Sequence, residues 1–343
     1  MKTIVAHAPH DLRLEEREMP HPGPGEVLVR MSRGGICGSD LHYYHHGGFG
    51  SVRLREPMIL GHEVSGHIEA VGDGVDMPLG TLVAVSPSRP CYACKYCTAA
   101  QHNHCLKMRF YGSAMPFPHI QGAFCEWLVA DIRQCAPATG LTPGVAALAE
   151  PLAVVLHAAR RAGDLMGKRV LVTGCGPIGQ LAVLVARSAG AVEVVATDVT
   201  PFTLQMATRM GADTTHNMAE DPAALDAYAA DKGRFDVAFE CSGIAAALAG
   251  AVPALRPGAV VMQLGLGGDM TLPLQAMTAK EIELRGSFRF HAAFFTAVEM
   301  LRASRLDPSP LITHTLPLRD AVAAFDLASD RSQAIKAQIA FAD

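Results

Sequence analysis

The sequence has no block of basic residues and no long, unbroken apolar run. Its 343 residues include 29 Lys and Arg against 33 Asp and Glu, a formal net charge of −4. This balance argues against nucleic acid or an anionic membrane as a partner. The longest apolar runs are interrupted by Glu150, Pro151 and Arg187, so we expect no membrane-spanning segment. Residues 1–7 lack the apolar core of a signal peptide, which favours a cytoplasmic location.

Charged side chains are also scarce. They make up 18% of the chain against 50% hydrophobic residues, so a sizeable core can form, and the length suggests about two domains. Nine cysteines are present, an odd number, and four of them are clustered. In a chain that looks cytosolic, this pattern favours metal binding over disulfides.

The clustered cysteines have the spacing C-x₂-C-x₂-C-x₇-C, formed by Cys91, Cys94, Cys97 and Cys105. Zinc prefers four soft ligands in a tetrahedron, and short spacings let one loop wrap the ion. Four reduced structural thiols or an iron–sulfur cluster are the alternatives, although a bacterial ferredoxin run would continue with x₃ and Cys-Pro. We expect a structural zinc lobe over residues 88–108, with no ligand position left for a substrate.

A second metal site is indicated by Cys37 together with the adjacent pair His62 and Glu63. Cys37 lies among small residues in the stretch 33–42, where glycines let backbone and substrate approach closely. Thiolate, imidazole and carboxylate all bind zinc, so we expect these three side chains to meet on one catalytic zinc. Glu150 lies among small apolar residues, where an ionised carboxylate is costly unless it is paired or bound to a metal. The alternative is an acid placed at a helix N-terminus beside a proline.

A nucleotide-binding half begins near residue 168. An apolar run leads into a glycine-rich loop and then into a stretch with apolar residues at helical spacing. We expect this loop to bind a dinucleotide pyrophosphate through Gly174, Gly176, Pro177, Ile178 and Gly179. Asp198 ends the next predicted strand, 19 residues after Gly179, close to the ~20 expected for the acid that binds the ribose hydroxyls. No arginine follows it directly, so we expect NAD to be preferred, with NADP possible.

Strands and helices alternate from there onward. The expected strands are 192–197, 235–240, 259–264 and 283–287, and the expected helices are 202–210 and 245–255. This alternation predicts a doubly wound parallel sheet. The residues before it instead form short strands separated by Gly/Pro turns, which predicts a β-rich domain. The tail from residue 288 is too short for a domain of its own, so we expect it to return to the first domain.

Taken in their order along the chain, these motifs resemble those of the zinc-dependent medium-chain dehydrogenases, and the resemblance covers essentially the whole chain. Within that family the chain looks most like the polyol branch, which includes sorbitol, xylitol and L-idonate dehydrogenases. Three stretches, 33–44, 108–115 and 284–290, look most like the L-idonate enzymes. The resemblance implies a GroES-like catalytic domain over residues 1–155 and 288–343, an inserted Rossmann domain over 156–287, and an active site in the cleft between them.

The resemblance also implies roles for single side chains. Cys37, His62 and Glu63 match the ligands of a catalytic zinc, and Glu150 matches an acid that binds this zinc or holds its water. Which of the two glutamates binds the resting zinc stays open. The four cysteines of the lobe match a structural zinc site, so two zinc ions are expected in each subunit.

Four further positions match residues that handle the proton and the substrate. Ser39 and His42 match a relay that carries the proton of the alcohol to solvent. Tyr43 and Arg289 match positions that contact the polyol chain, and Arg289 is our candidate for binding the carboxylate of a sugar acid or its neighbouring hydroxyls. The family also implies a homotetramer or a homodimer.

The resulting hypothesis is the oxidation of a secondary alcohol of a sugar acid or polyol with hydride transfer to NAD(P), with L-idonate, oxidised to 5-keto-D-gluconate, as the leading substrate. Sorbitol, xylitol or another polyol is the alternative within the family. A zinc-free, NADPH-linked quinone reductase is the distant alternative, and a non-catalytic protein with the same fold is the remaining one. The presence of Cys37, His62 and Asp198 argues against the quinone reductase, and the complete set of zinc ligands and relay residues argues against a non-catalytic protein.

Overall fold

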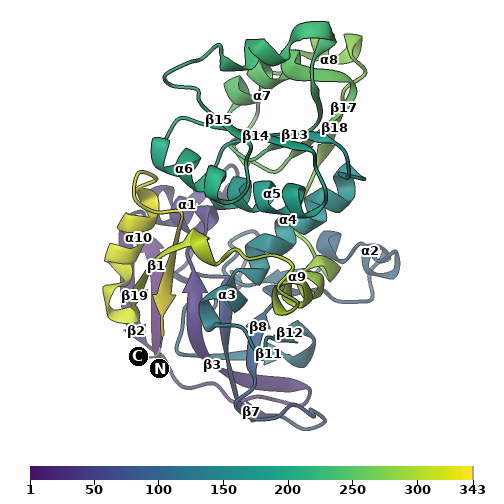
Figure 1. The fold of residues 1–343 in the computed structure, drawn as a ribbon. Coiled ribbons are helices and arrows are strands. Elements are labelled where there is room, and N and C mark those ends of the chain that lie inside the picture. Colours follow the sequence, from purple (N-terminus) through teal and green to yellow (C-terminus); the bar gives the residue numbers. More distant parts are fainter. Residues whose placement is uncertain (342–343) are drawn as a thin grey trace. The chain divides into compact units, whose positions relative to one another are not determined.

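The computed structural model describes residues 1–341, which form two compact units. The first unit contains Met1–Ala153, Phe290–Asp330 and the C-terminal segment from Lys336 onward. The second contains Val154–Arg289 and the short segment Arg331–Ile335, so it interrupts the first unit twice along the chain (Figure 1). Within residues 1–341, none of the helices combines the length and the apolar character that crossing a membrane requires.

The first unit is built mainly from strands. Its strands are β1 (Lys2–Ala8), β2 (Asp11–Glu16), β3 (Glu26–Gly35), β4 (Gly48–Phe49), β5 (Val52–Arg53), β6 (Met58–Ile59), β7 (Glu63–Val71), β8 (Leu82–Val85), β9 (Ser88–Arg89), β10 (Arg109–Phe110), β11 (Trp127–Asp131), β12 (Cys135–Pro137), β19 (Ile312–Pro317) and β20 (Lys336–Ala340). Its helices are α1 (Gly38–His46), α2 (Lys95–Thr98), α3 (Pro143–Ala147), α9 (Ala292–Arg302) and α10 (Ala321–Ser329), and α4 (Ala149–Ala162) leads into the second unit. The β-rich character predicted for this part of the chain is confirmed.

Strand β3 organises the main sheet of this unit. The sheet has the order β12-β8-β7-β3-β20-β19, and β11 also pairs with β3. The tail therefore returns to the N-terminal strands, because β20 pairs antiparallel with β3. The core contains Phe124, which lies so close to Gly61 that a Cβ at Gly61 would come within 2.1 Å of the ring. Gly61 also has φ +91°, so only glycine fits immediately before His62.

The stretch after Cys37 is helical, and the sequence analysis did not predict this helix. Helix α1 begins at Gly38, with Cys37 as its N-cap and Gly47 in the left-handed conformation at its C-terminal end. The backbone N–H of Cys37 donates to Asp40 Oδ2 at 2.9 Å, which is half of a capping box. A cysteine at the N-cap is an unusual helix signal, which explains why the sequence pattern alone did not reveal this helix.

The second unit is a parallel sheet with helices. Its strands are β13 (Arg169–Thr173), β14 (Glu193–Asp198), β15 (Thr214–Asn217), β16 (Phe235–Glu240), β17 (Leu255–Gln263) and β18 (Glu283–Gly286), and its helices are α5 (Pro177–Ser188), α6 (Pro201–Arg209), α7 (Ala245–Ala251) and α8 (Leu274–Ala279). The strand order is β15-β14-β13-β16-β17-β18 and every pairing is parallel. Numbered within the unit this is 3-2-1-4-5-6, the order of dinucleotide-binding sheets. The predicted doubly wound sheet is confirmed.

One helix of this unit is shorter than the sequence predicted. The expected helix over 245–255 ends at Ala251, because Pro253 lacks the N–H that an α-helix needs, and a 3₁₀ turn takes the chain into β17.

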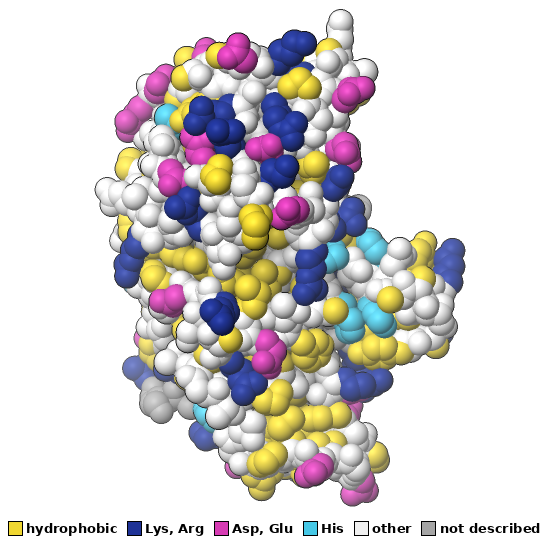
Figure 2. Space-filling model, turned by 45° about the vertical axis from the view of Figure 1, so that its right-hand side comes forward, with side chains coloured by type: hydrophobic (Ala, Val, Ile, Leu, Met, Phe, Trp, Pro, Cys, Tyr) yellow, Lys and Arg dark blue, Asp and Glu magenta, His cyan; other side chains and the backbone are white. Residues whose placement is uncertain are grey.

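On the molecular face shown in Figure 2, acidic and basic side chains are interspersed over the surface.

The glycine-rich loop makes a stability prediction. A Cβ at Gly179 would lie 1.8 Å from the carbonyl oxygen of Gly174, and backbone cannot move aside as a flexible side chain can. We expect Gly179→Ala to lower the free energy of unfolding by about 1–3 kcal/mol, the usual range for overpacking. Gly250→Ala is the matched control, because a Cβ there meets nothing within 4 Å and the exposed helix should gain about 0.5–1 kcal/mol. Chemical denaturation monitored by circular dichroism measures both, and equal shifts would contradict the packing argument.

Candidate zinc and dinucleotide sites

The sheet register brings the first group of metal ligands together. Gly35 at the end of β3 pairs with Glu63 at the start of β7, so Cys37, two residues beyond β3, lies next to His62 and Glu63. One ligand atom from each of these three side chains lies within 4.8 Å of the other two. His62 and Glu63 are buried, whereas Cys37 is half-buried. Three protein ligands leave one position of a tetrahedral zinc open, as in catalytic zinc sites.

Asp40 was not singled out from the sequence, although it positions this group. Its carboxylate is completely buried and accepts hydrogen bonds from the backbone N–H of Cys37 and, at 3.1 Å, from that of Gly61. Its Oδ1 also lies 3.7 Å from Nδ1 of His62, which is buried and hydrogen-bonds to no group in the described part of the chain. Asp40 thus ties together both segments that carry the ligands, as the outer partners of metal ligands do.

Lys336 is the second residue that the sequence interpretation missed. Its Nζ donates to both carboxylate oxygens of Glu63, at 2.9 and 2.8 Å, and to the carbonyl oxygen of Ile36 at 3.0 Å. It is 2% exposed. Burial alone would lower the pKa of Lys336, but Glu63 and Cys37 outweigh burial and raise it. The ammonium therefore stays charged and holds the carboxylate in place.

Burial makes most of the acidic groups around this site costly to ionise. Burial raises the pKa of Cys37 to about 12, with Glu63 adding to the effect, and burial raises the pKa values of Asp40 and, well above its usual value, Glu150. One buried lysine thus faces four acidic groups, so a divalent cation would supply the missing positive charge and convert the thiol to a thiolate. The donor set of sulfur, nitrogen and oxygen fits zinc.

The other residues expected near the catalytic zinc lie on two helices. Glu150 is 5% exposed in the first turn of α4 and lies near enough to His62 and Glu63 to be influenced by their charges. It is not one of the three ligands that lie within 4.8 Å of each other. Ser39 and His42 are both on α1, three positions apart and half-buried, and residues at this spacing share a helix face. Burial, together with two neighbouring histidines, lowers the pKa of His42, so its ring is neutral near pH 7.

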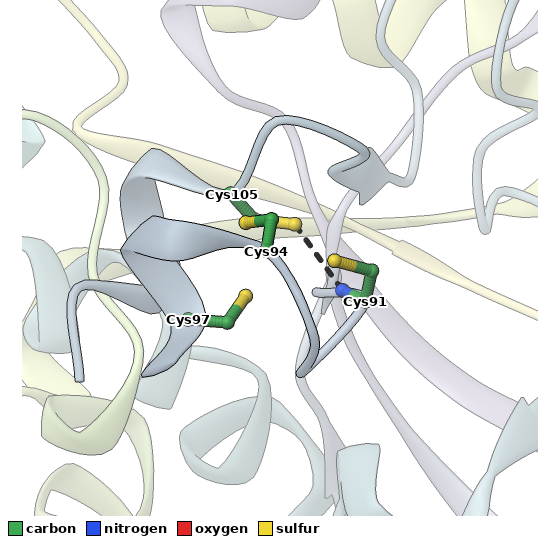
Figure 3. A group of neighbouring side chains, drawn as sticks. All are labelled: Cys91, Cys94, Cys97 and Cys105. Atoms are coloured by element: carbon green, nitrogen blue, oxygen red, sulfur yellow. Dashed lines mark hydrogen bonds between the residues drawn. The ribbon is translucent and has the colours of Figure 1, made fainter. Parts of the chain in front are cut away.

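The four clustered cysteines form a second, separate group (Figure 3). Their sulfur atoms all lie within 4.8 Å of one another. Backbone N–H groups of Cys91 and Lys107 donate to Sγ of Cys105 at 3.2 and 3.3 Å, and backbone hydrogen bonds lower the pKa of Cys94 to about 6. Donors that point at sulfur stabilise thiolates, so this loop fits a tetrahedral zinc with four protein ligands.

The glycine-rich loop has the geometry of a pyrophosphate site. Gly174, with φ +84°, makes the turn after β13, and a Cβ there would meet Ser242 at 2.7 Å. Gly176 is the N-cap of α5, and a Cβ there would meet nothing within 4 Å. The backbone therefore stays open to a ligand at a helix N-terminus where Pro177 occupies the first turn. Gly179 packs the helix against the strand.

Asp198 ends β14 beside this loop, but its carboxylate is fully engaged. Oδ2 accepts from the N–H of Cys175 at 2.6 Å and from Nη2 of Arg331 at 2.7 Å, and Oδ1 accepts from Val199 and Thr200 at 2.7 and 3.1 Å. Arg331 was also missed from the sequence, because it follows Asp198 by 133 residues.

The two expected substrate residues lie in different units. Tyr43 is 2% exposed in the first unit, and its hydroxyl accepts a hydrogen bond from the backbone N–H of Ala114 at 3.0 Å. Arg289 is the last residue of the long segment of the second unit, where it has φ +52° and its guanidinium lies 5.1 Å from the centre of the Phe288 ring. A positive φ on an arginine is a local strain.

The buried ion pair makes a prediction about stability. Lys336→Met in the metal-free protein leaves Glu63 buried without its partner, so we expect a loss of about 3–5 kcal/mol in the free energy of unfolding. Adding Glu63→Gln should restore part of this loss because it removes the unpaired charge. Arg302→Ala is the control: it breaks an exposed pair with Glu299 and should cost at most about 1 kcal/mol. Losses of similar size for Lys336→Met and Arg302→Ala would refute the argument from burial.

Both parts of the chain are similar to known proteins. Residues 23–140 match the alcohol dehydrogenase GroES-like domain, and residues 177–303 match the zinc-binding dehydrogenase family. The chain is 44% identical over 317 residues to L-idonate 5-dehydrogenase (NAD(P)(+)) of Escherichia coli strain K12, covering 92% of each. It is 36% identical over 339 residues to sorbitol dehydrogenase of Gallus gallus, covering 97% of this chain and 94% of that protein.

The similarity extends to three dimensions. The crystal structure of L-idonate 5-dehydrogenase from Escherichia coli K-12 superposes with a TM-score of 0.95 at 42% identity, covering 99% of this chain and 98% of that one. The family implies a nicotinamide dinucleotide and zinc, and both ligand groups and the glycine-rich loop fit them. The chain belongs to the zinc-binding alcohol dehydrogenases with a GroES-like domain.

Proposed function

We propose that this protein oxidises a secondary alcohol of a sugar acid or polyol with NAD(P), and that its substrate is L-idonate, which would become 5-keto-D-gluconate. The observation that carries the proposal is the pairing, in one chain, of the Cys37–His62–Glu63 group with an open glycine-rich loop. The choice of L-idonate rests on the relative that is 44% identical. Sorbitol or another polyol is the second candidate, since a sorbitol dehydrogenase is 36% identical.

Zinc would polarise the substrate hydroxyl as a Lewis acid, and the nicotinamide would accept the hydride. The side chains of this protein would then handle the proton. Ser39 and His42 lie three positions apart on α1, and His42 is neutral near pH 7 because burial lowers its pKa. It is therefore able to accept a proton passed on from Ser39 and deliver it to solvent. Glu63 would bind the metal, and Glu150 would bind it or hold its water.

Substrate positioning is assigned to Tyr43 and Arg289. A guanidinium is always charged in proteins. Arg289 would therefore bind the carboxylate of a sugar acid through charge-assisted hydrogen bonds. Tyr43 is buried and lies on α1, the helix that also carries Ser39 and His42. It would shape the substrate site next to this helix.

We also propose functions for the two units. The first unit is the catalytic domain and carries both zinc ions, with the structural zinc bound by Cys91, Cys94, Cys97 and Cys105. The second unit binds the dinucleotide through Gly174, Gly176, Pro177, Ile178, Gly179 and Asp198. The assembly proposed from the family is a cytoplasmic homodimer or homotetramer.

The zinc assignment predicts the metal content of single variants. We expect wild-type protein to contain two zinc ions per chain and Cys37→Ser to contain one. Losing an outer partner of a metal ligand costs up to about 100-fold in activity. Losing a ligand itself should therefore cost more than about 100-fold. Cys97→Ser should lose the other zinc and, mainly, thermal stability. Cys125→Ser is the matched control, because Cys125 is buried outside both groups, and it should retain two zinc ions. Elemental analysis and thermal unfolding measure these effects.

Dialysis against a strong chelator separates this mechanism from that of a zinc-free NADPH-linked quinone reductase. Activity should disappear and return on addition of zinc. Full activity in protein shown by elemental analysis to be free of metal would eliminate the zinc mechanism.

Substrate identity is tested by a panel of L-idonate, sorbitol, xylitol and L-threonine with NAD and with NADP. We expect the highest kcat/KM with L-idonate. Arg289→Ala should lower kcat/KM for L-idonate by about 10- to 100-fold, the value of a charged hydrogen bond, and should affect the uncharged sorbitol much less. Arg289→Lys keeps the charge and should retain part of the activity. A kcat/KM for L-idonate that stays within about twofold after Arg289→Ala would remove the role of Arg289.

A further inference from the structure

The carboxylate of Asp198 has no acceptor position left for a ribose hydroxyl. A carboxylate offers about four lone-pair sites, and four donors already occupy those of Asp198: the backbone N–H groups of Cys175, Val199 and Thr200, and Nη2 of Arg331. A dinucleotide that binds here through its 2′-hydroxyl must therefore displace one of these donors.

Arg331 is the donor that can leave. The other three are backbone groups fixed by the turns after β13 and β14, whereas Arg331 reaches the site with a long, flexible side chain. Its side chain is 51% exposed, while that of Asp198 is only 2% exposed. Arg331 begins the segment Arg331–Ile335, which belongs to the second unit although the residues on both sides of the segment belong to the first.

The pair also changes the charge at the ribose site. A lone carboxylate at the end of this strand repels a 2′-phosphate, and this repulsion is how such an acid selects NAD. Arg331 neutralises the carboxylate at a distance of 2.7 Å. A guanidinium carries five N–H donors in a planar fork that matches phosphate oxygens, and the contact with Asp198 involves Nη2.

We propose that Arg331 determines cofactor preference, by binding the 2′-phosphate of NADP and by neutralising the Asp198 carboxylate that would otherwise repel this phosphate. The inference deepens the proposed function and rests on the second unit being the dinucleotide-binding one. Both cofactors are accepted: NADP binds to Arg331 while it is paired with Asp198, and NAD binds when its ribose hydroxyls replace Arg331 on Oδ2. This arginine comes from the C-terminal part of the chain, 133 residues beyond Asp198, and not from the residues directly after it.

The test is direct titration of the zinc-containing protein with NADH and with NADPH, followed by the change in nicotinamide fluorescence, which does not depend on turnover. Wild-type protein should bind both. Arg331→Ala should weaken NADPH binding by about 10- to 100-fold, because it removes a charged hydrogen bond and exposes the Asp198 charge. NADH binding should stay the same or become tighter, since Oδ2 is then open. The NADPH affinity of Arg331→Lys should fall between those of the wild-type protein and Arg331→Ala, because lysine keeps the charge but lacks the planar fork of donors.

Arg234→Ala is the matched control. Arg234 is also half-exposed and pairs with a carboxylate, Glu193, but at the opposite end of β14, so both dissociation constants should stay unchanged. An unchanged ratio of NADPH to NADH affinity in Arg331→Ala would overturn the inference alone, as would an equal loss of both affinities. Wild-type protein that binds neither nucleotide would overturn the proposed function and the inference with it.

Discussion

Buried negative charge is the constraint on which the catalytic unit depends. Cys37, Asp40, Glu63 and Glu150 carry acidic groups around one small volume, and Lys336 is the cation that pairs there with Glu63. Each ionised group would be costly in this environment without a partner. Burial raises the pKa values of Cys37 and Glu150 and so favours their neutral forms, and a divalent cation bound here would favour the ionised forms instead.

The sheet makes this arrangement possible. Strand β3 pairs with β7 on one side and with β20 on the other, so Glu63 and Lys336, far apart in sequence, end beside the chain that leads to Cys37. A Cβ at Gly35 would lie in contact with a carboxylate oxygen of Glu63, and Gly61 accommodates the ring of Phe124. Small residues here let charged groups and backbone approach closely, which rigid positioning of metal ligands requires.

The second unit solves a different problem, the recognition of a ligand that carries its own negative charge. Backbone groups at the start of α5 form the site proposed for the pyrophosphate, and Asp198, the carboxylate proposed to meet the adenosine ribose, is already paired with Arg331. Selectivity at such a place depends on the difference between two binding free energies, so a single mobile cation is enough to change it. In the proposed role of Arg331, the short segment that supplies this residue would link the C-terminal part of the chain to cofactor binding.

The sequence by itself determined the local motifs: the four-cysteine spacing, the glycine-rich loop, the adjacent His62 and Glu63, and the alternation of strands and helices in the second unit. These follow from short-range geometry, which neighbouring residues fix. Tertiary structure alone decided that Asp40 ties the ligand segments together, that Lys336 neutralises Glu63, and that Arg331 occupies Asp198. Lys336 and Glu63 are 273 residues apart, and Arg331 and Asp198 are 133 residues apart. Sequence periodicity cannot reveal such pairs, because only the folding of the whole chain brings the partners together.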